Sequence, residues 1–290
     1  MVQTIATAEG RTLAVHSDGD AAGFPVVMHH GTPSSGLLYE RHVALAREQG
    51  IRLIGYNRPG YGGSAREQGR TVADCAADVD AIADALQLER FGTWGISGGG
   101  PHALACAALC DRRLVAVASL AAVAPYGVDD LDWLAGMGEE NHVEFGHAHA
   151  GEDALRTYLD KEAQAILAAG PDELVAVMET LLGPADRAVL SGAFAEYLLE
   201  ADRHALADGV DGWVDDDLAF LAPWGFELGS IDRPVLLLHG NDDRFVPVAH
   251  GRWLADRIPG VEARIDPDDG HLTLIERRMR EVNEWLLAHT

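Results

Sequence analysis

The stretch Thr93-Trp94-Gly95-Ile96-Ser97-Gly98-Gly99-Gly100-Pro101 decides how the rest of this chain is interpreted. It contains the pattern Gly-x-Ser-x-Gly, between a strand-like apolar run and a small-residue helical run, His102 to Leu109. A strand that turns this sharply into a helix holds Ser97 at the apex of a strained turn, where the flanking glycines leave room for the backbone. The pattern therefore predicts an exposed serine nucleophile, although a simple small-residue helix start would have the same sequence.

The composition is that of a folded, acidic protein, and its net charge argues against certain classes of binding partner. Hydrophobic residues make up 48% of the 290 residues, and the formal net charge is −24. Nucleic acid and anionic membranes would repel such a chain, so we expect neither as a partner. No apolar run approaches the ~20 residues of a membrane span. Because the N-terminus has no basic region followed by an apolar block, we expect a cytoplasmic protein. The sequence carries no indication of the oligomeric state.

Alternating strand and helix patterns predict an α/β fold. Strands are expected at residues 3–7, 11–16, 25–29, 52–56, 91–96, 114–124, 235–239 and 262–265, the first two of them antiparallel. Helices are expected at 37–49, 71–86, 102–109, 248–258 and 274–288. Strands that alternate with helices in this way indicate a mostly parallel central sheet flanked by helices on both faces.

From residue 126 to about 230 the pattern is helical only, with helices expected at 154–169, 171–182 and 186–207. The predicted domain organisation is a core made of residues 1–125 and 231–290, interrupted by an all-helical insertion at 126–230. Ligands of α/β proteins bind beyond the carboxyl ends of the strands, so we expect this insertion to form a cap or lid. Its acidic run, Asp215-Asp216-Asp217, is expected to be a solvated loop or a helix start.

A serine nucleophile needs a base to take its proton and a third group to orient that base. The strand at 235–239 is followed by a loop that contains Asp242 and Asp243. The last strand is followed by Gly270-His271, ahead of the final helix. The chain order serine, acid, histidine is the one expected when such a site is built on this kind of sheet.

Taken together, these motifs resemble those of the α/β-hydrolase-fold serine hydrolases with an inserted helical cap, in particular carboxylesterases. The resemblance covers the core, about 1–125 and 231–290. The stretches that carry it are His30-Gly31-Thr32-Pro33, Arg58-Pro59-Gly60-Tyr61-Gly62-Gly63-Ser64, Gly95 to Gly99, Gly240 to Pro247 and Gly270-His271. Each stretch is short, but their order along the chain and their positions after the expected strands agree.

The resemblance implies a role for each site residue. Ser97 is the expected nucleophile, His271 the general base and then acid, and Asp243 the acid that orients the histidine. The backbone N–H groups of Thr32 and Gly98 are the expected oxyanion hole. Asp242 is the neighbouring alternative, with a helix cap as its structural role, and Asp129 and Asp130 are reserves. His30 is expected to brace its loop.

Serine rather than aspartate at the turn favours hydrolysis of an acyl compound over dehalogenation or epoxide opening. The resemblance implies a carboxylesterase that acts on a small or medium apolar ester. Enzymes with the same triad form the alternatives: proline iminopeptidase-like aminopeptidases, carbon–carbon bond hydrolases, and cofactor-free haloperoxidases or perhydrolases. A non-catalytic ligand-binding relative is a further alternative. For an aminopeptidase, the acids available in the insertion to hold a substrate amine are Glu139, Glu140, Glu196 and Glu200.

Three residues of the insertion, Trp133, Met137 and Phe145, are the expected lining of the substrate pocket. We expect no cofactor and no metal, because the cluster of His142, His147 and His149 lacks a recognised zinc-binding pattern. Cys75, Cys106 and Cys110 are an odd number of thiols without a secretory signal, so they are expected to be reduced and to pack as small apolar residues.

Overall fold

The computed structural model describes residues 2–171 and 173–290, in which the strands form one eight-stranded sheet of order β1-β2-β4-β3-β5-β6-β7-β8. The strands are β1 (Val2–Ala6), β2 (Thr12–Gly19), β3 (Phe24–His29), β4 (Ile51–Tyr56), β5 (Phe91–Ile96), β6 (Leu114–Leu120), β7 (Val235–Gly240) and β8 (Glu262–Asp266). β2 pairs antiparallel with β1 and β4, and the remaining pairs are parallel. The mostly parallel sheet predicted from the sequence is therefore confirmed.

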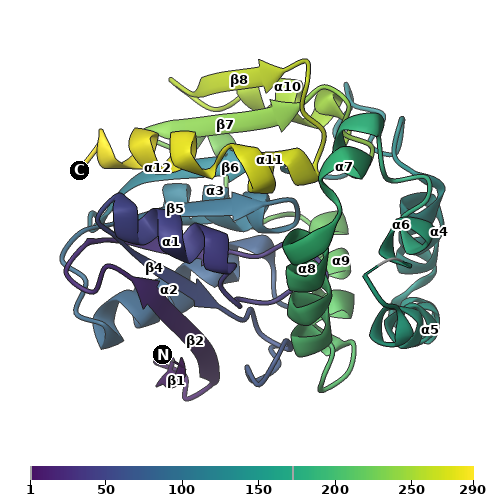
Figure 1. Cartoon of the computed structure of the whole chain (residues 1–290), viewed down its shortest axis with the longest axis horizontal. Helices are drawn as coiled ribbons and strands as arrows, with labels where there is room; N and C mark the ends of the chain where they lie inside the picture. Colours follow the sequence, from purple (N-terminus) through teal and green to yellow (C-terminus); the bar gives the residue numbers. More distant parts are fainter. Residues whose placement is uncertain (1, 172) are drawn as a thin grey trace.

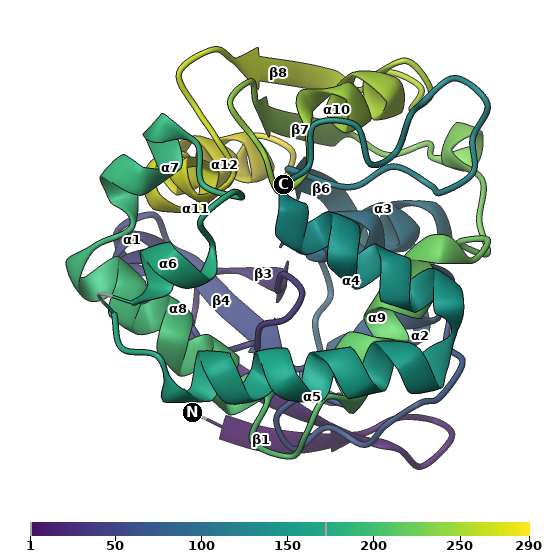
Figure 2. The same ribbon diagram turned by 90° about the vertical axis from the view of Figure 1, so that its right-hand side faces the viewer.

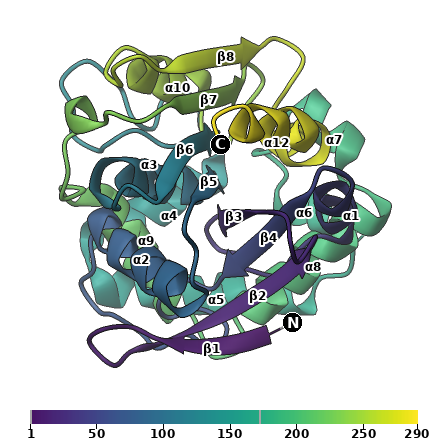
Figure 3. The same cartoon turned by 90° about the vertical axis from the view of Figure 1, so that its left-hand side faces the viewer.

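Helices cover both faces of this sheet, which explains why β5 and β7 are buried along their whole length. One face carries α1 (Glu40–Glu48), α11 (Leu272–Arg277) and α12 (Met279–Leu287). The other carries the 3-10 turn Val72–Asp74, α2 (Cys75–Ala85), α3 (Gly99–Leu109) and α10 (Val248–Ala255). Figure 3 shows the two helical layers on either side of the strands.

The chain between β6 and β7 is helical, as predicted, and stands beyond the carboxyl ends of the strands (Figures 1 and 2). It contains α4 (Glu139–Ala150), α5 (Glu152–Ala168), α6 (Leu174–Val177), α7 (Pro184–Val189), α8 (Gly192–Ala205) and α9 (Asp211–Leu221), before a 3-10 turn at Leu228–Ser230. We call α4 to α9 the helical insertion. Within the described residues, no helix has the length and apolar character needed to cross a bilayer.

Several element boundaries differ from the prediction. The strand expected to reach residue 124 ends at Leu120, because Ala121 takes a left-handed φ of 45°. The helix expected at 186–207 is two helices, α7 and α8, separated at Leu190 and Ser191. The helix expected at 171–182 is limited to α6, and Asp172 inside that range lies outside the described residues. The sequence reading missed α4 and α9.

Candidate active site

Ser97 lies in the sharp turn between β5 and α3. Its φ of 54° is left-handed, which is uncommon for a residue other than glycine. The turn needs its glycines, since a Cβ on Gly95 would stand 2.1 Å from the Gly99 carbonyl oxygen and one on Gly99 would stand 2.3 Å from that of His29. The Ser97 N–H donates to the Leu120 carbonyl at 2.9 Å. The strained strand–turn–helix geometry expected from Gly-x-Ser-x-Gly is thus present.

His271 and Asp243 come together from different loops at the same edge of the sheet. His271 Nδ1 lies 2.8 Å from Asp243 Oδ2, and the other carboxylate oxygen accepts the Val246 N–H at 2.8 Å. Since a carboxylate only accepts, Nδ1 carries the proton and Nε2 is left available as a base. Phe245 stacks on the imidazole, with ring centroids 4.6 Å apart. Both side chains of the pair are almost fully buried.

The charge environment of His271 suits a base that becomes protonated. Burial alone would lower the pKa of His271, but the Asp243 carboxylate, its hydrogen bond and the nearby Asp186 outweigh burial and raise that pKa above 6.5. The histidine is therefore paired with an acid that stabilises its charged form.

A residue of the helical insertion holds the backbone around His271. Asp186, fully buried in α7, accepts the N–H of His271 at 2.9 Å and those of Leu272 and Thr273 at 2.8 and 3.1 Å. It satisfies the orphan donors at the start of α11 in the way that a capping residue would, but from a distant element. Sequence reasoning missed Asp186, because nothing in its local sequence indicates a partner 85 residues away.

The loop that carries Thr32 packs directly against the turn at Ser97. A Cβ on Gly98 would lie 2.3 Å from Thr32 Oγ1, so the two predicted oxyanion-hole residues are immediate neighbours. His30 braces the loop from below, as expected, by accepting the Arg58 N–H at 3.1 Å.

A buried ion network fixes this loop to α9. Asp216 pairs with Arg58 at 2.6 Å and with Arg70 at 2.7 Å, and it accepts the hydroxyl of Thr32 at 2.7 Å. Arg58 also donates to the Gly31 carbonyl at 2.9 Å. Burial alone would raise the pKa of Asp216, but the two guanidinium groups hold that pKa well below its usual range. The network joins the loop, the core and the insertion.

The acidic run at residues 215–217 was predicted to be solvated, and that prediction is wrong. All three carboxyl side chains are buried in α9. Asp215 binds Arg66 at 2.8 Å, Asp216 belongs to the network above, and Asp217 faces the interior. The overlooked signal is the apolar residues around the run, Trp213, Val214 and Phe220, which mark a packed helix rather than a loop.

A cavity of about 180 Å³ opens at Ser97 and His271 under the insertion. Its apolar lining includes Phe245, Leu272 and Ile275 from the core, and Ile166, Val177, Met178 and Leu181 from the insertion. Its wall in the insertion includes Glu140, Glu144, Tyr158, Glu162, Tyr197, Asp202 and Trp213. A pocket of this shape, closed on one side by the core and on the other by helices, can hold an acyl compound against the serine.

The three residues expected to line the pocket lie within the hydrophobic core. The Trp133 indole N–H donates to the Ala124 carbonyl at 2.7 Å, and the ring packs edge-on against Phe145 at 4.6 Å. Among the described residues that line the cavity, Trp133, Met137 and Phe145 are absent. Their packing holds the start of the insertion onto the core.

The alternative acids occupy other positions. Asp242 accepts the Ala185 N–H at 3.4 Å and so contacts the insertion rather than capping the following helix. Asp129 and Asp130 are exposed, and Asp130 pairs with Arg257 and accepts the Trp253 indole N–H. Of the four insertion acids considered for an amine, Glu140 lines the cavity, whereas Glu139, Glu196 and Glu200 are exposed.

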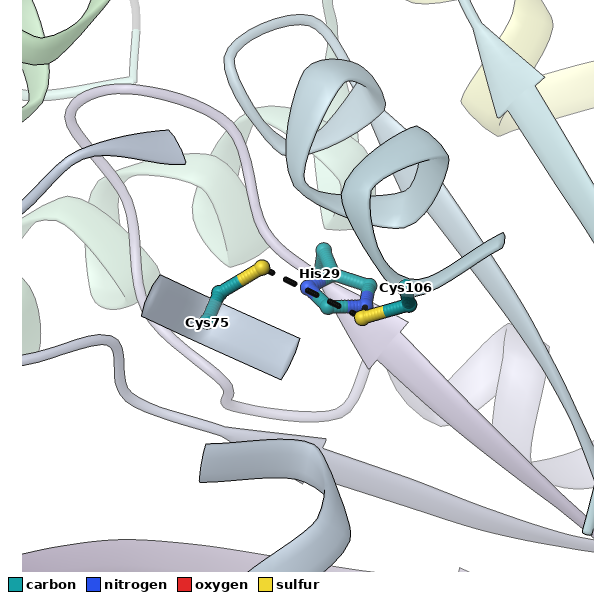
Figure 4. A group of neighbouring side chains, drawn as sticks. All are labelled: His29, Cys75 and Cys106. Carbon is teal, nitrogen blue, oxygen red and sulfur yellow. Dashed lines mark hydrogen bonds between the residues drawn. The ribbon is translucent and has the colours of Figure 1, made fainter. Parts of the chain in front are cut away.

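His29, Cys75 and Cys106 form a buried group whose ligand atoms all lie within 4.8 Å of one another (Figure 4). These are atoms of the kind that bind zinc. However, burial lowers the pKa of His29 and raises the pKa of both thiols, and His29 Nδ1 already lies 3.0 Å from the Tyr56 hydroxyl. A cation would have to displace protons from both thiols. All three cysteines are free and buried, as expected.

Comparison with known proteins gives consistent relatives. A family model described as alpha/beta hydrolase fold matches residues 25–147. A non-heme chloroperoxidase of Streptomyces lividans is 30% identical over 85% of this chain and 84% of its own. A pimeloyl-[acyl-carrier protein] methyl ester esterase of Nitrosomonas europaea is 25% identical over 89% of this chain and 92% of its own. The crystal structure of a bromoperoxidase from Bacillus anthracis superposes with a TM-score of 0.72, at 22% identity over 100% and 99% of the two chains.

Proposed function

Because the chain belongs to the α/β-hydrolase family, we propose that it is a serine hydrolase that cleaves small or medium esters through a Ser97–His271–Asp243 triad. The observation that carries this proposal is the 2.8 Å contact between His271 Nδ1 and Asp243, in a cavity that also receives the strained Ser97 turn. An orienting acid, an available ring nitrogen and an accessible serine are the parts that nucleophilic acyl transfer requires.

In the proposed mechanism, His271 Nε2 takes the proton of Ser97 Oγ as that oxygen bonds to the acyl carbon. The negative carbonyl oxygen of the tetrahedral intermediate accepts the N–H groups of Thr32 and Gly98, each worth ~3 kcal/mol of transition-state stabilisation. The intermediate collapses, and His271 passes its proton to the leaving alkoxide. Water then attacks the acyl-enzyme with His271 again as base, and the carboxylic acid leaves. These steps need no cofactor.

The size and lining of the cavity support an ester over a longer lipid. Its volume of about 180 Å³ and its apolar wall at Phe245, Leu272 and Ile275 suit a short acyl chain. The family relatives include an esterase at 25% identity, which agrees with this substrate class.

The proposal is tested with purified protein and p-nitrophenyl acetate, butyrate and hexanoate. We expect turnover, and a fluorophosphonate adduct located on Ser97 by mass spectrometry. The Ser97→Ala variant should lose at least ~10³-fold in kcat/KM. Unchanged turnover in this variant, or an adduct on another residue, would contradict the proposal.

A second candidate function is perhydrolysis, favoured by the chloroperoxidase relative. Here hydrogen peroxide replaces water as the attacking nucleophile on the acyl-enzyme and releases a peracid, which oxidises halide in solution. Bromination of monochlorodimedone in acetate, peroxide and bromide measures it. Acetate-dependent bromination that exceeds ester hydrolysis in rate would rank this function first, and its absence would leave the esterase.

A further inference from the structure

The insertion contributes several carboxyl groups to the cavity lining, among apolar residues such as Ile166, Met178 and Leu181. Four of its lining residues carry carboxyl groups: Glu140 and Glu144 from α4, Glu162 from α5 and Asp202 from α8. In the described part of the chain, neither lysine nor arginine lines this cavity. The chain as a whole is acidic, but surface carboxylates are solvated, whereas these converge on an enclosed space.

Asp202 is the most unusual member of this group. The residue is only 7% exposed, lines the cavity, and its carboxyl group has no hydrogen bond or ion pair with any described residue. Burial alone raises the pKa of Asp202 to about 8. Because this carboxyl group has no partner in the described part of the protein and lies in the cavity lining, a group bound in the cavity can pair with it.

The neighbouring acid Glu144 likewise has no positively charged partner among the described residues. Its carboxylate accepts the Trp213 indole N–H at 2.8 Å. Burial raises the pKa of Glu144, and burial together with Glu144 raises that of Asp217 behind it. Tyr158 lies close enough to Glu162, Glu144 and Glu140 for their charges to add to the effect of burial in raising its own pKa. The charges of Glu140, Glu144 and Glu162 therefore act together at Tyr158, in the cavity wall.

Aromatic rings also line the cavity. Tyr158, Tyr197 and Trp213 share the lining with the acids. Carboxylates combined with aromatic faces are the surroundings that stabilise an organic ammonium group, by ion pairing and by cation–π attraction. Beside His271 the lining is apolar, because Phe245 stacks on the imidazole and Leu272 follows it in the chain.

From this lining we propose that the cavity selects esters whose acyl or alcohol part carries a cationic amine, with Asp202, which gives up its proton to solvent as the ammonium group binds, as the main counter-charge and Glu144 and Glu162 as supporting groups. The ester lies at Ser97, the chain passes the apolar wall, and the ammonium group reaches α8. The inference rests on the proposed hydrolase function for its kinetic test, but its binding test does not depend on catalysis.

The kinetic test compares p-nitrophenyl esters of ω-amino acids with three to eight carbons against the uncharged n-alkyl esters of equal length. Within this series we expect a chain length at which the amino ester exceeds its uncharged counterpart in kcat/KM by about tenfold or more. Asp202→Asn should reduce that ratio about tenfold and Glu162→Gln should reduce it by a smaller factor. Asp160→Asn, an equal charge change at an exposed position of α5, is the matched control and should keep the ratio.

A ratio near or below one at every chain length, or a ratio that is the same in wild type and Asp202→Asn, would overturn the inference. The binding test measures the rise in melting temperature caused by hexylammonium chloride relative to an equal concentration of 1-hexanol, corrected with sodium chloride. Wild type should be stabilised more by the ammonium ion, and Asp202→Asn should lose the difference. If Ser97→Ala still hydrolyses esters while this difference persists, the triad fails and the cation site stands.

Discussion

At the scale of single residues, Ser97 stores backbone strain in the turn where we propose that it acts as the nucleophile. Its φ of 54° is unfavourable for a side chain with a Cβ, by ~1 kcal/mol, and neutral for glycine. We therefore expect Ser97→Gly to be more stable than Ser97→Ala by about 1 kcal/mol, although both variants lack the nucleophile. Urea unfolding of the two variants measures this difference. Equal midpoints, or a more stable alanine variant, would argue against strain at the turn.

The proposed role of His271 makes activity depend on pH, and the charges around His271 set the pH range of that dependence. In the proposed mechanism only the neutral imidazole accepts the serine proton, so activity should rise as pH rises through the pKa of His271. Because Asp243 and Asp186 raise that pKa, the acidic limb of kcat/KM should be centred above pH 6.5. Asp243→Asn should move the limb to lower pH and reduce kcat by roughly 10³- to 10⁴-fold. A limb that stays in place in this variant would separate Asp243 from the base.

At the scale of elements, α9 and the Thr32 loop depend on a single buried carboxylate. Asp216→Asn would leave Arg58 and Arg70 buried without their counter-charge, and breaking such a pair costs about 3–5 kcal/mol. The matched control is Asp211→Asn on the same helix, whose side chain is 38% exposed and pairs with Arg66 and Arg156. It should cost less than ~1 kcal/mol. Guanidinium unfolding that ranks the two variants equally would contradict the network's role.

Element boundaries depended on contacts that local patterns do not contain. The range 186–207 has a continuous helical period, yet the chain turns at Leu190 and Ser191. The turn lets α7 bring Asp186 to the start of α11 while α8 brings Asp202 to the cavity. Similarly, the sequence does not predict α4, because α4 is mostly polar and only two of its residues, Phe145 and Ala148, are buried.

At the scale of the whole molecule, buried histidines set the response to acid. Burial lowers the pKa of His42 and His250 to about 4 and that of His102 to about 3, against ~6.5 in an unfolded chain. Below pH 6.5 the unfolded state binds protons that the folded state refuses, so stability is lost as pH falls from 6.5 towards 4. We expect the urea midpoint to fall steadily between pH 7 and 4.5.

Asp202 changes the stability with pH in the opposite direction to the buried histidines, which provides a control for this prediction. Its pKa is raised to about 8, so the folded state keeps a proton that the unfolded state loses above pH ~4, and this group costs stability as pH rises towards 8. Asp202→Asn should therefore stabilise the protein more at pH 8 than at pH 5.

For the buried histidines, a urea midpoint of the wild type that stays constant from pH 7 to 4.5 would contradict the prediction.

The sequence by itself determined the order of the strands and of the helices that flank them, the mostly parallel sheet and the turn around Ser97. These follow from hydrophobic periodicity and from glycines at fixed spacing, which are local properties of the chain. Only the tertiary structure decided that Asp216 clamps the Thr32 loop, that Asp186 holds the backbone of His271, and that Asp202 faces the cavity. Whether a carboxyl group is solvated, paired or left without a partner depends on which distant elements pack around it, and no local pattern contains that information.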